Sequence, residues 1–257
     1  MARMSCNFHS SVLGMATGME VILPQPDMST LSKERIEAGW PVLYLLHGLS
    51  DDHTMWQRRT SIERYATARN LAVVMPSGGR SFYTDMARGY NYRTFISEEL
   101  PKIVRSFFRI STAREDTFIA GLSMGGYGAL KTALSLPQNF AAAASLSGVA
   151  DITAFTNRDM NQMEARNIFG DDLAVTGTDH DLFHLADRLA SDETAPDLML
   201  YQCCGTEDFL YQDNLRFRDH VMSLGLNLLY EEGPGIHEWA YWDKHIQRVI
   251  GWLPIKP

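Results

Sequence analysis

The sequence has little cysteine, no long apolar run and a deficit of basic residues. Its 257 residues include 3 cysteines, Cys6, Cys203 and Cys204. An odd number of cysteines without regular spacing does not form a disulfide framework and favours free thiols in a reducing compartment. No window approaches the roughly 18 apolar residues of a membrane-spanning helix, and the amino-terminal segment lacks the apolar core of a secretory signal. We therefore expect a cytoplasmic protein that does not enter a membrane.

The charge balance is acidic and the remaining composition is that of a globular chain. Lysine and arginine total 23 against 31 aspartate and glutamate, so the formal net charge is −8. A protein that binds a phosphate backbone has the opposite balance, and we expect no nucleic-acid partner. Hydrophobic residues make up 45% of the chain, which is enough for a full core at this length. Residues 1–257 are predicted to form one domain, and the sequence leaves open whether copies of it form a homo-oligomer.

From residue 42 onward, short apolar runs alternate with longer stretches of helical spacing. A continuous apolar run such as 42–46 is typical of a strand buried on both faces of a parallel sheet. The alternation predicts an α/β fold with a mainly parallel sheet and helices on both faces. Earlier in the chain, two runs at 11–15 and 19–23 around Thr17-Gly18 predict a β-hairpin, followed by a polar connection at 27–39. Further strands are predicted at 71–75, 117–120, 141–146, 198–202 and 226–230, and helices at 54–69, 94–108, 124–136, 214–224 and 239–252.

Residues 148–196 interrupt this alternation. The segment has no strong strand pattern and separates two predicted strands, and segments of this length between elements are commonly functional covers. Helical spacing is visible near 160–168 and 182–189. We predict a small cap insertion over the edge of the sheet. Its apolar residues, which a solvent-facing loop would not need, are Phe155, Met160, Met163, Ile168 and Phe169.

A glycine-rich turn has the strongest local motif. Gly121-Leu122-Ser123-Met124-Gly125 has the form G-x-S-x-G, follows a predicted strand and opens a predicted helix. This is the context of a nucleophile elbow, in which a strained turn lifts the serine hydroxyl above the sheet. The amino end of the helix also favours developing negative charge. We therefore predict Ser123 as a nucleophile rather than as a simple helix cap.

A serine hydroxyl is a weak nucleophile and needs a base with an orienting acid. In this architecture both follow the serine in the chain. Glu207 and Asp208 follow the predicted strand 198–202, and His237 follows the predicted strand 226–230. All of these groups therefore fall at the carboxyl edge of one parallel sheet, where open α/β sheets bind their ligands. The residues predict His237 as the base and leave the acid open between the two carboxylates.

An oxyanion hole needs backbone donors from the residue after the nucleophile and from an earlier loop. Met124 supplies the first donor, and the loop His47-Gly48-Leu49 supplies the second through the amide of Leu49. Because His47 precedes the serine in the chain, we interpret it as a structural turn residue rather than as the base. His180 and His184 lack the glutamate of the zinc-protease pattern, so we expect no metal.

Four blocks of sequence, in order, are similar to one known family. They are Tyr44-Leu45-Leu46-His47-Gly48, the run from Gly121 to Ala129, Cys204-Gly205-Thr206-Glu207-Asp208 and Gly235-Ile236-His237-Glu238-Trp239. Together they resemble the esterase D-like α/β-hydrolases, and the chain is most similar to the bacterial tributyrin or acetyl esterases over residues 8–252. The resemblance implies the α/β-hydrolase fold, with Ser123 as nucleophile, His237 as base and Asp208 as acid. It also implies cofactor-free hydrolysis of a small-molecule ester with a short acyl chain, acetyl to butyryl.

Other activities share this scaffold. S-formylglutathione hydrolases have the same elbow, but Gly89-Tyr90-Asn91-Tyr92 stands here where a tryptophan-containing segment is expected. Feruloyl esterases and mycolyl transferases are further relatives, so the acyl group and the choice between water and an alcohol as acceptor stay open. A prolyl-oligopeptidase-type peptidase is disfavoured because 257 residues leave no room for its gating domain. A non-catalytic binding protein on a hydrolase fold would be favoured by a missing triad member, and here none is missing.

Overall fold

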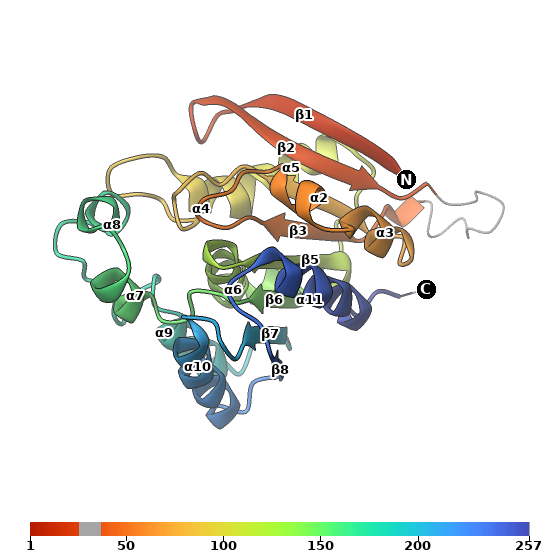
Figure 1. The fold of residues 1–257 in the computed structure, drawn as a ribbon. Helices are drawn as coiled ribbons and strands as arrows, with labels where there is room; N and C mark the ends of the chain where they lie inside the picture. The colour runs from red at the N-terminus through yellow and green to blue at the C-terminus, as the bar shows by residue number, and fades with distance from the viewer. Residues whose placement is uncertain (26–36, 257) are drawn as a thin grey trace.

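The computed structural model describes residues 1–25 and 37–256. Within these residues the strands form one eight-stranded sheet in the order β1-β2-β4-β3-β5-β6-β7-β8 (Figure 1). β1 pairs antiparallel with β2, and β2 antiparallel with β4, whereas all other neighbours are parallel. The predicted mainly parallel α/β sheet is therefore confirmed. The strands are β1 Ala2–Ser10, β2 Met15–Leu23, β3 Val42–Leu46, β4 Ala72–Pro76, β5 Thr117–Leu122, β6 Ala142–Leu146, β7 Met199–Gly205 and β8 Leu228–Gly233.

The predicted hairpin is present, but its turn lies elsewhere in the sequence. Residues 11–14 form the turn, and Gly18 lies inside β2, where it pairs with Asn7 of β1. Gly14 has a φ of +64°, a left-handed value that glycine adopts without strain. The turn was predicted at Gly18 rather than at Gly14 because the run 11–15 is apolar enough to resemble a strand. Most of the predicted polar connection at 27–39 lies outside the described residues.

The predicted helices are present, with interruptions that the spacing did not reveal. The stretch 54–69 contains two short helices, because Thr60 Oγ1 donates to Trp56 O at 2.5 Å and Ser61 N donates to the Asp243 carboxylate at 3.0 Å. The stretch 94–108 contains a π-helical turn over Phe95–Glu99. The helices are α2 Met55–Arg59, α3 Ile62–Thr67, α4 Tyr92–Thr94, α5 Leu100–Phe107, α6 Met124–Ser135, α7 Ile152–Arg158, α8 Gln162–Phe169, α9 Leu182–Ser191, α10 Tyr211–Ser223 and α11 Trp239–Trp252.

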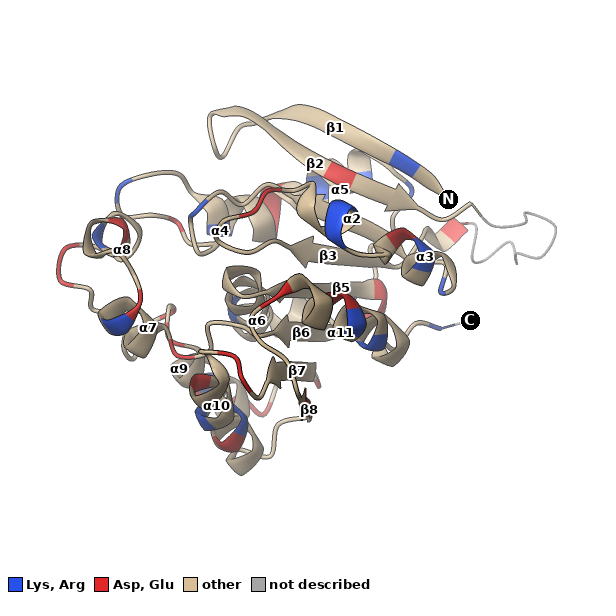
Figure 2. Ribbon diagram, in the orientation of Figure 1, with Lys and Arg blue, Asp and Glu red and all other residues tan. Residues whose placement is uncertain are grey.

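The central strands separate two hydrophobic cores. In β3, Val42, Tyr44 and Leu46 belong to one core, and Leu43 and Leu45 belong to the other. The first core includes residues of α5, α6, α9 and α10, and the second includes residues of α2, α3 and α11. Because both faces are covered, strands such as β3, β5, β6 and β7 contain no charged residue, and the charges lie on helices, loops and outer strands (Figure 2).

Residues 148–196 lie between β6 and β7 and contain α7, α8 and α9. α7 was not predicted from the spacing. The side chains of Asp151, Asn161 and Asp181 accept hydrogen bonds from backbone N–H groups in the first turns of the three helices, which stabilises each start. α9 packs against α6, whereas α7 and α8 lie beyond the carboxyl ends of the strands, at the left of Figure 1. α8 is held there because Ala87 N and Arg88 N donate to carbonyls in α8 at 3.0 and 2.8 Å.

Two further expectations concern the cysteines and membranes. Cys6, Cys203 and Cys204 are free thiols, and burial raises the pKa of both thiols in β7. Among the described helices, none has the length and apolar content required to cross a membrane.

Candidate active site

Ser123 stands at a sharp turn between β5 and α6. Its φ of +53° and ψ of −119° lie outside the regions that non-glycine residues favour, and such strain costs about 1–3 kcal/mol. The turn can be this tight because its neighbours lack side chains. A Cβ on Gly121 would lie 2.3 Å from the backbone of Gly125, and one on Gly125 would lie 2.5 Å from Leu46 O. The motif glycines therefore hold the hydroxyl of Ser123 at the carboxyl edge of the sheet.

The structure brings the three predicted side chains into one hydrogen-bonded chain. His237 Nε2 lies 3.0 Å from Ser123 Oγ, and His237 Nδ1 lies 2.9 Å from Asp208 Oδ2. The carboxylate can only accept, so Nδ1 donates to it and Nε2 is left to accept from the serine hydroxyl. The three residues come from three different loops, after β5, β7 and β8. Their geometry is that of a nucleophile, a base and an acid that orients the base.

The two neighbouring carboxylates occupy different places. Asp208 is fully buried at its side chain, and its Oδ1 accepts from Leu210 N at 2.9 Å. Glu207 accepts from Gly235 N at 2.6 Å, and this hydrogen bond lowers the pKa of its carboxyl group. Glu207 therefore ties down the loop that precedes His237, while Asp208 makes the direct contact with the imidazole.

Leu49 and Met124, the two predicted oxyanion donors, border the same pocket as Ser123. Met124 begins α6, and the first N–H groups of a helix have no acceptor within it. The loop with Leu49 is held by His47, whose Nδ1 lies 2.7 Å from Gly48 O and whose Nε2 accepts from Gly78 N at 2.9 Å. Burial lowers the pKa of His47 to about 4. His47 is thus a neutral loop residue with both ring nitrogens hydrogen-bonded, in agreement with its interpretation as a structural turn residue.

Comparison with known proteins identifies the family. The sequence matches the Esterase family over residues 10–253. The chain belongs to this family. An acetyl esterase from Caldicellulosiruptor saccharolyticus is 34% identical to it, and the match covers 98% of each chain.

Two solved structures of Staphylococcus aureus proteins are similar to this esterase over nearly its whole length. One is substrate-bound FphF, a fluorophosphonate-binding serine hydrolase, with 41% identity, a TM-score of 0.90, and coverage of 100% of this chain and 99% of the other. The second is an S-formylglutathione hydrolase, FrmB, with 42% identity, a TM-score of 0.86 and coverage of 98% of each chain. The protein is accordingly a serine esterase with the α/β-hydrolase fold, a carboxylic ester hydrolase that acts on small molecules.

The pocket of this esterase beside Ser123 has a volume of about 480 Å³, within the range of small-molecule sites. Its walls are largely aromatic, with Phe82, Phe155, Phe209, Trp239 and Trp242. The ring centroids of Phe209 and Trp242 lie 4.8 and 4.9 Å from that of His237. Both rings therefore pack against the imidazole and restrict its rotation.

Charged residues that the sequence did not predict as part of the site also border this pocket, among them Asp51 and Arg80. Asp51 follows the loop of Leu49 by two positions and is half-buried. Arg80 donates to Leu49 O at 3.3 Å and to both carboxylate oxygens of Glu164, on α8, at 2.6 and 2.9 Å. The position of Asp51 two residues after Leu49, the predicted oxyanion donor, is a signal that the sequence contains. Arg80 had none, because its partners lie in distant parts of the chain.

Of the five apolar residues of 148–196 that the sequence singles out, one borders the pocket. Phe155 lines it and is 8% exposed, whereas Met163 is 73% exposed and contacts solvent. Met160, Ile168 and Phe169 are buried in the first core. Phe169 supports the pocket wall from behind, because its ring centroid lies 6.1 Å from that of Phe82, which lines the pocket. Of the five residues, Phe155 therefore has a place at the pocket, whereas Met160, Ile168 and Phe169 contribute to the core and Met163 faces water.

Behind the pocket, α6 contains a buried lysine that the motif analysis did not single out. Lys131 is 1% exposed, and its Nζ donates to Thr84 Oγ1 at 2.5 Å and lies 3.4 Å from His180 Nδ1. Burial lowers the pKa of Lys131 to about 7 and that of His180 to about 4. His180 is therefore a packing partner of Lys131. His184 lies on α9 in no cluster of potential metal ligands within the described residues.

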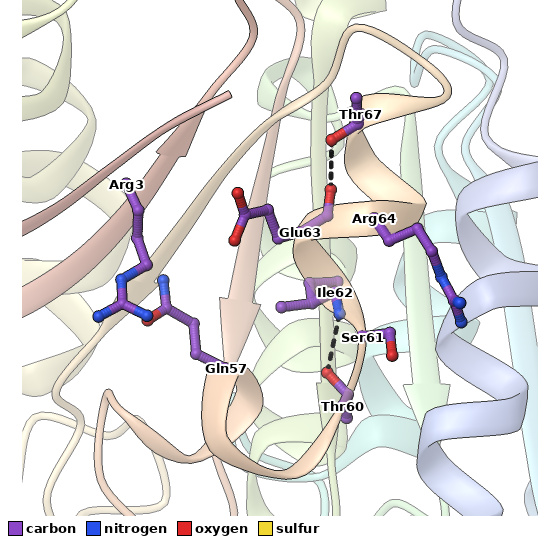
Figure 3. Close-up of a pocket in the computed structure, with 8 residues that line it drawn as sticks. All are labelled: Arg3, Gln57, Thr60, Ser61, Ile62, Glu63, Arg64 and Thr67. Carbon is purple, nitrogen blue, oxygen red and sulfur yellow. Dashed lines mark hydrogen bonds between the residues drawn. The ribbon is translucent and has the colours of Figure 1, made fainter.

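A second pocket lies at α3, near β1 (Figure 3). It is lined mainly by polar side chains, among them Arg3, Gln57 and Glu63. Two of its hydroxyl groups serve the helix itself: Thr60 Oγ1 accepts from Ile62 N at 3.2 Å, and Thr67 Oγ1 donates to Glu63 O at 2.6 Å. These polar groups stabilise α3.

Proposed function

We propose that this esterase hydrolyses acetyl to butyryl esters through an acyl-enzyme on Ser123. The observation that carries the proposal is the continuous chain of hydrogen bonds from Ser123 Oγ through His237 to Asp208, at 3.0 and 2.9 Å. It opens into a pocket of limited volume. The similarity to an acetyl esterase supports the short acyl chain.

The steps follow from the geometry. Ser123 Oγ attacks the ester carbonyl carbon while its proton passes to His237 Nε2, and Asp208 stabilises the imidazolium that forms. The amides of Leu49 and Met124 donate to the oxyanion of the tetrahedral intermediate. His237 then returns the proton to the leaving alcohol oxygen as the carbon–oxygen bond breaks. Water repeats the sequence on the acyl-enzyme and releases the carboxylic acid.

We further propose that residues 148–196 are a cap insertion within a single domain, with Phe155 at the end of the acyl pocket. Phe155 packs against Phe82, another lining residue, at a centroid distance of 5.7 Å. We also propose a cytoplasmic location, because free thiols such as Cys203 and Cys204 are typical of a reducing compartment.

The first experiment is Ser123→Ala, which removes the hydroxyl from a turn and leaves the packing unchanged. Turnover of p-nitrophenyl acetate should fall by several orders of magnitude, with the melting temperature preserved. A fluorophosphonate should label Ser123 in the wild type, as peptide mapping would show. Near-normal hydrolysis by the variant, or labelling at another serine, would contradict the proposal.

A second candidate function is S-formylglutathione hydrolysis, favoured by the similarity to FrmB. A panel of p-nitrophenyl esters from acetyl to decanoyl, with S-formylglutathione and a feruloyl ester, separates the candidates. We expect kcat/KM to peak between acetyl and butyryl. A value for S-formylglutathione well above this peak would favour the second candidate instead.

A further inference from the structure

The pocket at Ser123 has a carboxylate that the proposed triad does not use. The point that a Cβ on Gly48 would occupy lies 3.1 Å from Asp51 Oδ2 and 3.7 Å from Ser123 Cβ. Asp51 Oδ2 therefore lies no more than 6.8 Å from Ser123 Cβ. Its own N–H donates to Gly48 O at 3.2 Å, which fixes the turn and keeps the side chain at the pocket.

Burial raises the pKa of the Asp51 carboxyl group, and the nearby Arg59 acts in the opposite direction. Within the described residues, Asp51 forms no ion pair with the cation that lines the pocket. Among the described residues, Arg80 is the only lysine or arginine that lines the pocket. Its guanidinium donates to both carboxylate oxygens of Glu164. A second carboxylate, that of Glu238, also borders the pocket. With the Arg80 charge balanced by Glu164, Asp51 and Glu238 leave the pocket with net negative charge.

Asp51 and Glu238 border the same pocket as His237, whose imidazole the alcohol of the ester must approach. In the proposed mechanism His237 delivers a proton to the leaving oxygen, so the alcohol lies against the imidazole. Phe209 and Trp242 flank the same imidazole. Aromatic faces together with carboxylates are the surroundings that bind ammonium groups in proteins.

We propose that this site selects esters whose alcohol is a cation, with an ammonium group held in the pocket, and that Asp51 is the main determinant. The inference rests on the proposed function, because it takes the ester to be cleaved at Ser123. Selection acts on substrate charge, and the acyl preference is separate from it.

The test compares three acetate esters of similar size and different charge. Acetylcholine is the cation, 3,3-dimethylbutyl acetate is its neutral isostere, and 2-acetoxyethanesulfonate is the anion. Hydrolysis is followed by pH-stat titration at pH 8 and low ionic strength. The wild-type protein should give kcat/KM values in the order cation, neutral, anion, with about a 5- to 10-fold preference for the cation over its isostere. Added salt should reduce this ratio.

Asp51→Asn should bring the ratio of cation to isostere close to one. Asp52→Asn is the matched control, since Asp52 is adjacent and equally charged but accepts from Thr54 N and Oγ1 at 2.8 and 2.6 Å and does not border the pocket. Its ratio should stay at the wild-type value. Because a ratio is measured, a change in overall activity does not affect the comparison, and the wild-type order tests the proposal even if Asp51→Asn fails to fold.

Two outcomes overturn the inference and leave the proposed function intact: equal rates for acetylcholine and its isostere in the wild type, or a ratio that Asp51→Asn does not change. Absence of hydrolysis of all three esters, with Ser123 unreactive toward a fluorophosphonate, would overturn the proposed function and the inference together.

Discussion

Replacement of Asp208 by asparagine tests how the acid acts on the base. Asp208 Oδ1 accepts from Leu210 N and Oδ2 contacts His237 Nδ1. An asparagine has one oxygen, and the Leu210 N–H requires it, so the amide NH₂ is directed at His237. Nδ1 must then accept, the proton moves to Nε2, and the imidazole can no longer take the proton of Ser123.

We expect kcat for p-nitrophenyl acetate to fall about 10³- to 10⁴-fold, which corresponds to about 4–5.5 kcal/mol in the activation barrier. KM should change little, because the tautomer of His237 affects the transition state and not ground-state binding. Stopped-flow measurement of the p-nitrophenol burst would assign the loss to acylation.

Glu207→Gln is the matched control. Glutamine keeps an oxygen that can accept from Gly235 N, the contact that Glu207 makes at 2.6 Å. This variant should lose no more than a few-fold in kcat. Equal losses in the two variants, or a larger loss in Glu207→Gln, would refute the reasoning and move the acid to Glu207.

Three further predictions concern the cap, the buried lysine and the oxyanion loop. Phe155→Ala should raise the octanoyl-to-butyryl ratio of kcat/KM about 10-fold, because the space left by the ring buries about two further methylenes at about 0.8 kcal/mol each. Met163→Ala, at an exposed residue, should leave the ratio unchanged, and a shift in both variants would contradict a pocket closed by Phe155. In urea denaturation, the free energy of unfolding of the wild type should rise by about 3 kcal/mol between pH 7 and pH 9.5. Folding lowers the pKa of Lys131 from the ordinary 10.5 to about 7, so over this range the unfolded chain keeps the proton that the folded protein loses. Lys131→Met should lack this rise, and an equal slope in both proteins would disprove it. Glu164→Gln weakens the ion pair that holds Arg80 against the carbonyl of Leu49, so kcat should fall several-fold with KM nearly constant. Asp171→Asn breaks the ion pair to Arg88 between the same two segments and should leave kcat unchanged. Equal kcat values in the two variants would exclude an effect of Glu164 on the loop of Leu49.

Features of this protein with local signals could be predicted from the amino-acid sequence. The apolar run of β3, the elbow around Ser123 and the order of Ser123, Asp208 and His237 are all properties of short stretches and their spacing. A strand that is buried on both faces must be apolar throughout, and a strained turn must have glycine where backbones approach each other. These constraints are visible without coordinates, so the fold class and the side chains that the structure brings together could be predicted.

Tertiary structure decided what depends on contacts between distant segments. Asp243 of α11 contacts Ser61 and helps to end α2, although the spacing of 54–69 predicts one helix. Of the apolar residues in 148–196, only packing determines that Phe155 meets the pocket while Met163 meets water. Arg80 reaches Glu164 across 84 positions of sequence. Such contacts depend on how whole helices and strands pack against one another, and the residues of a short stretch of sequence do not reveal that packing.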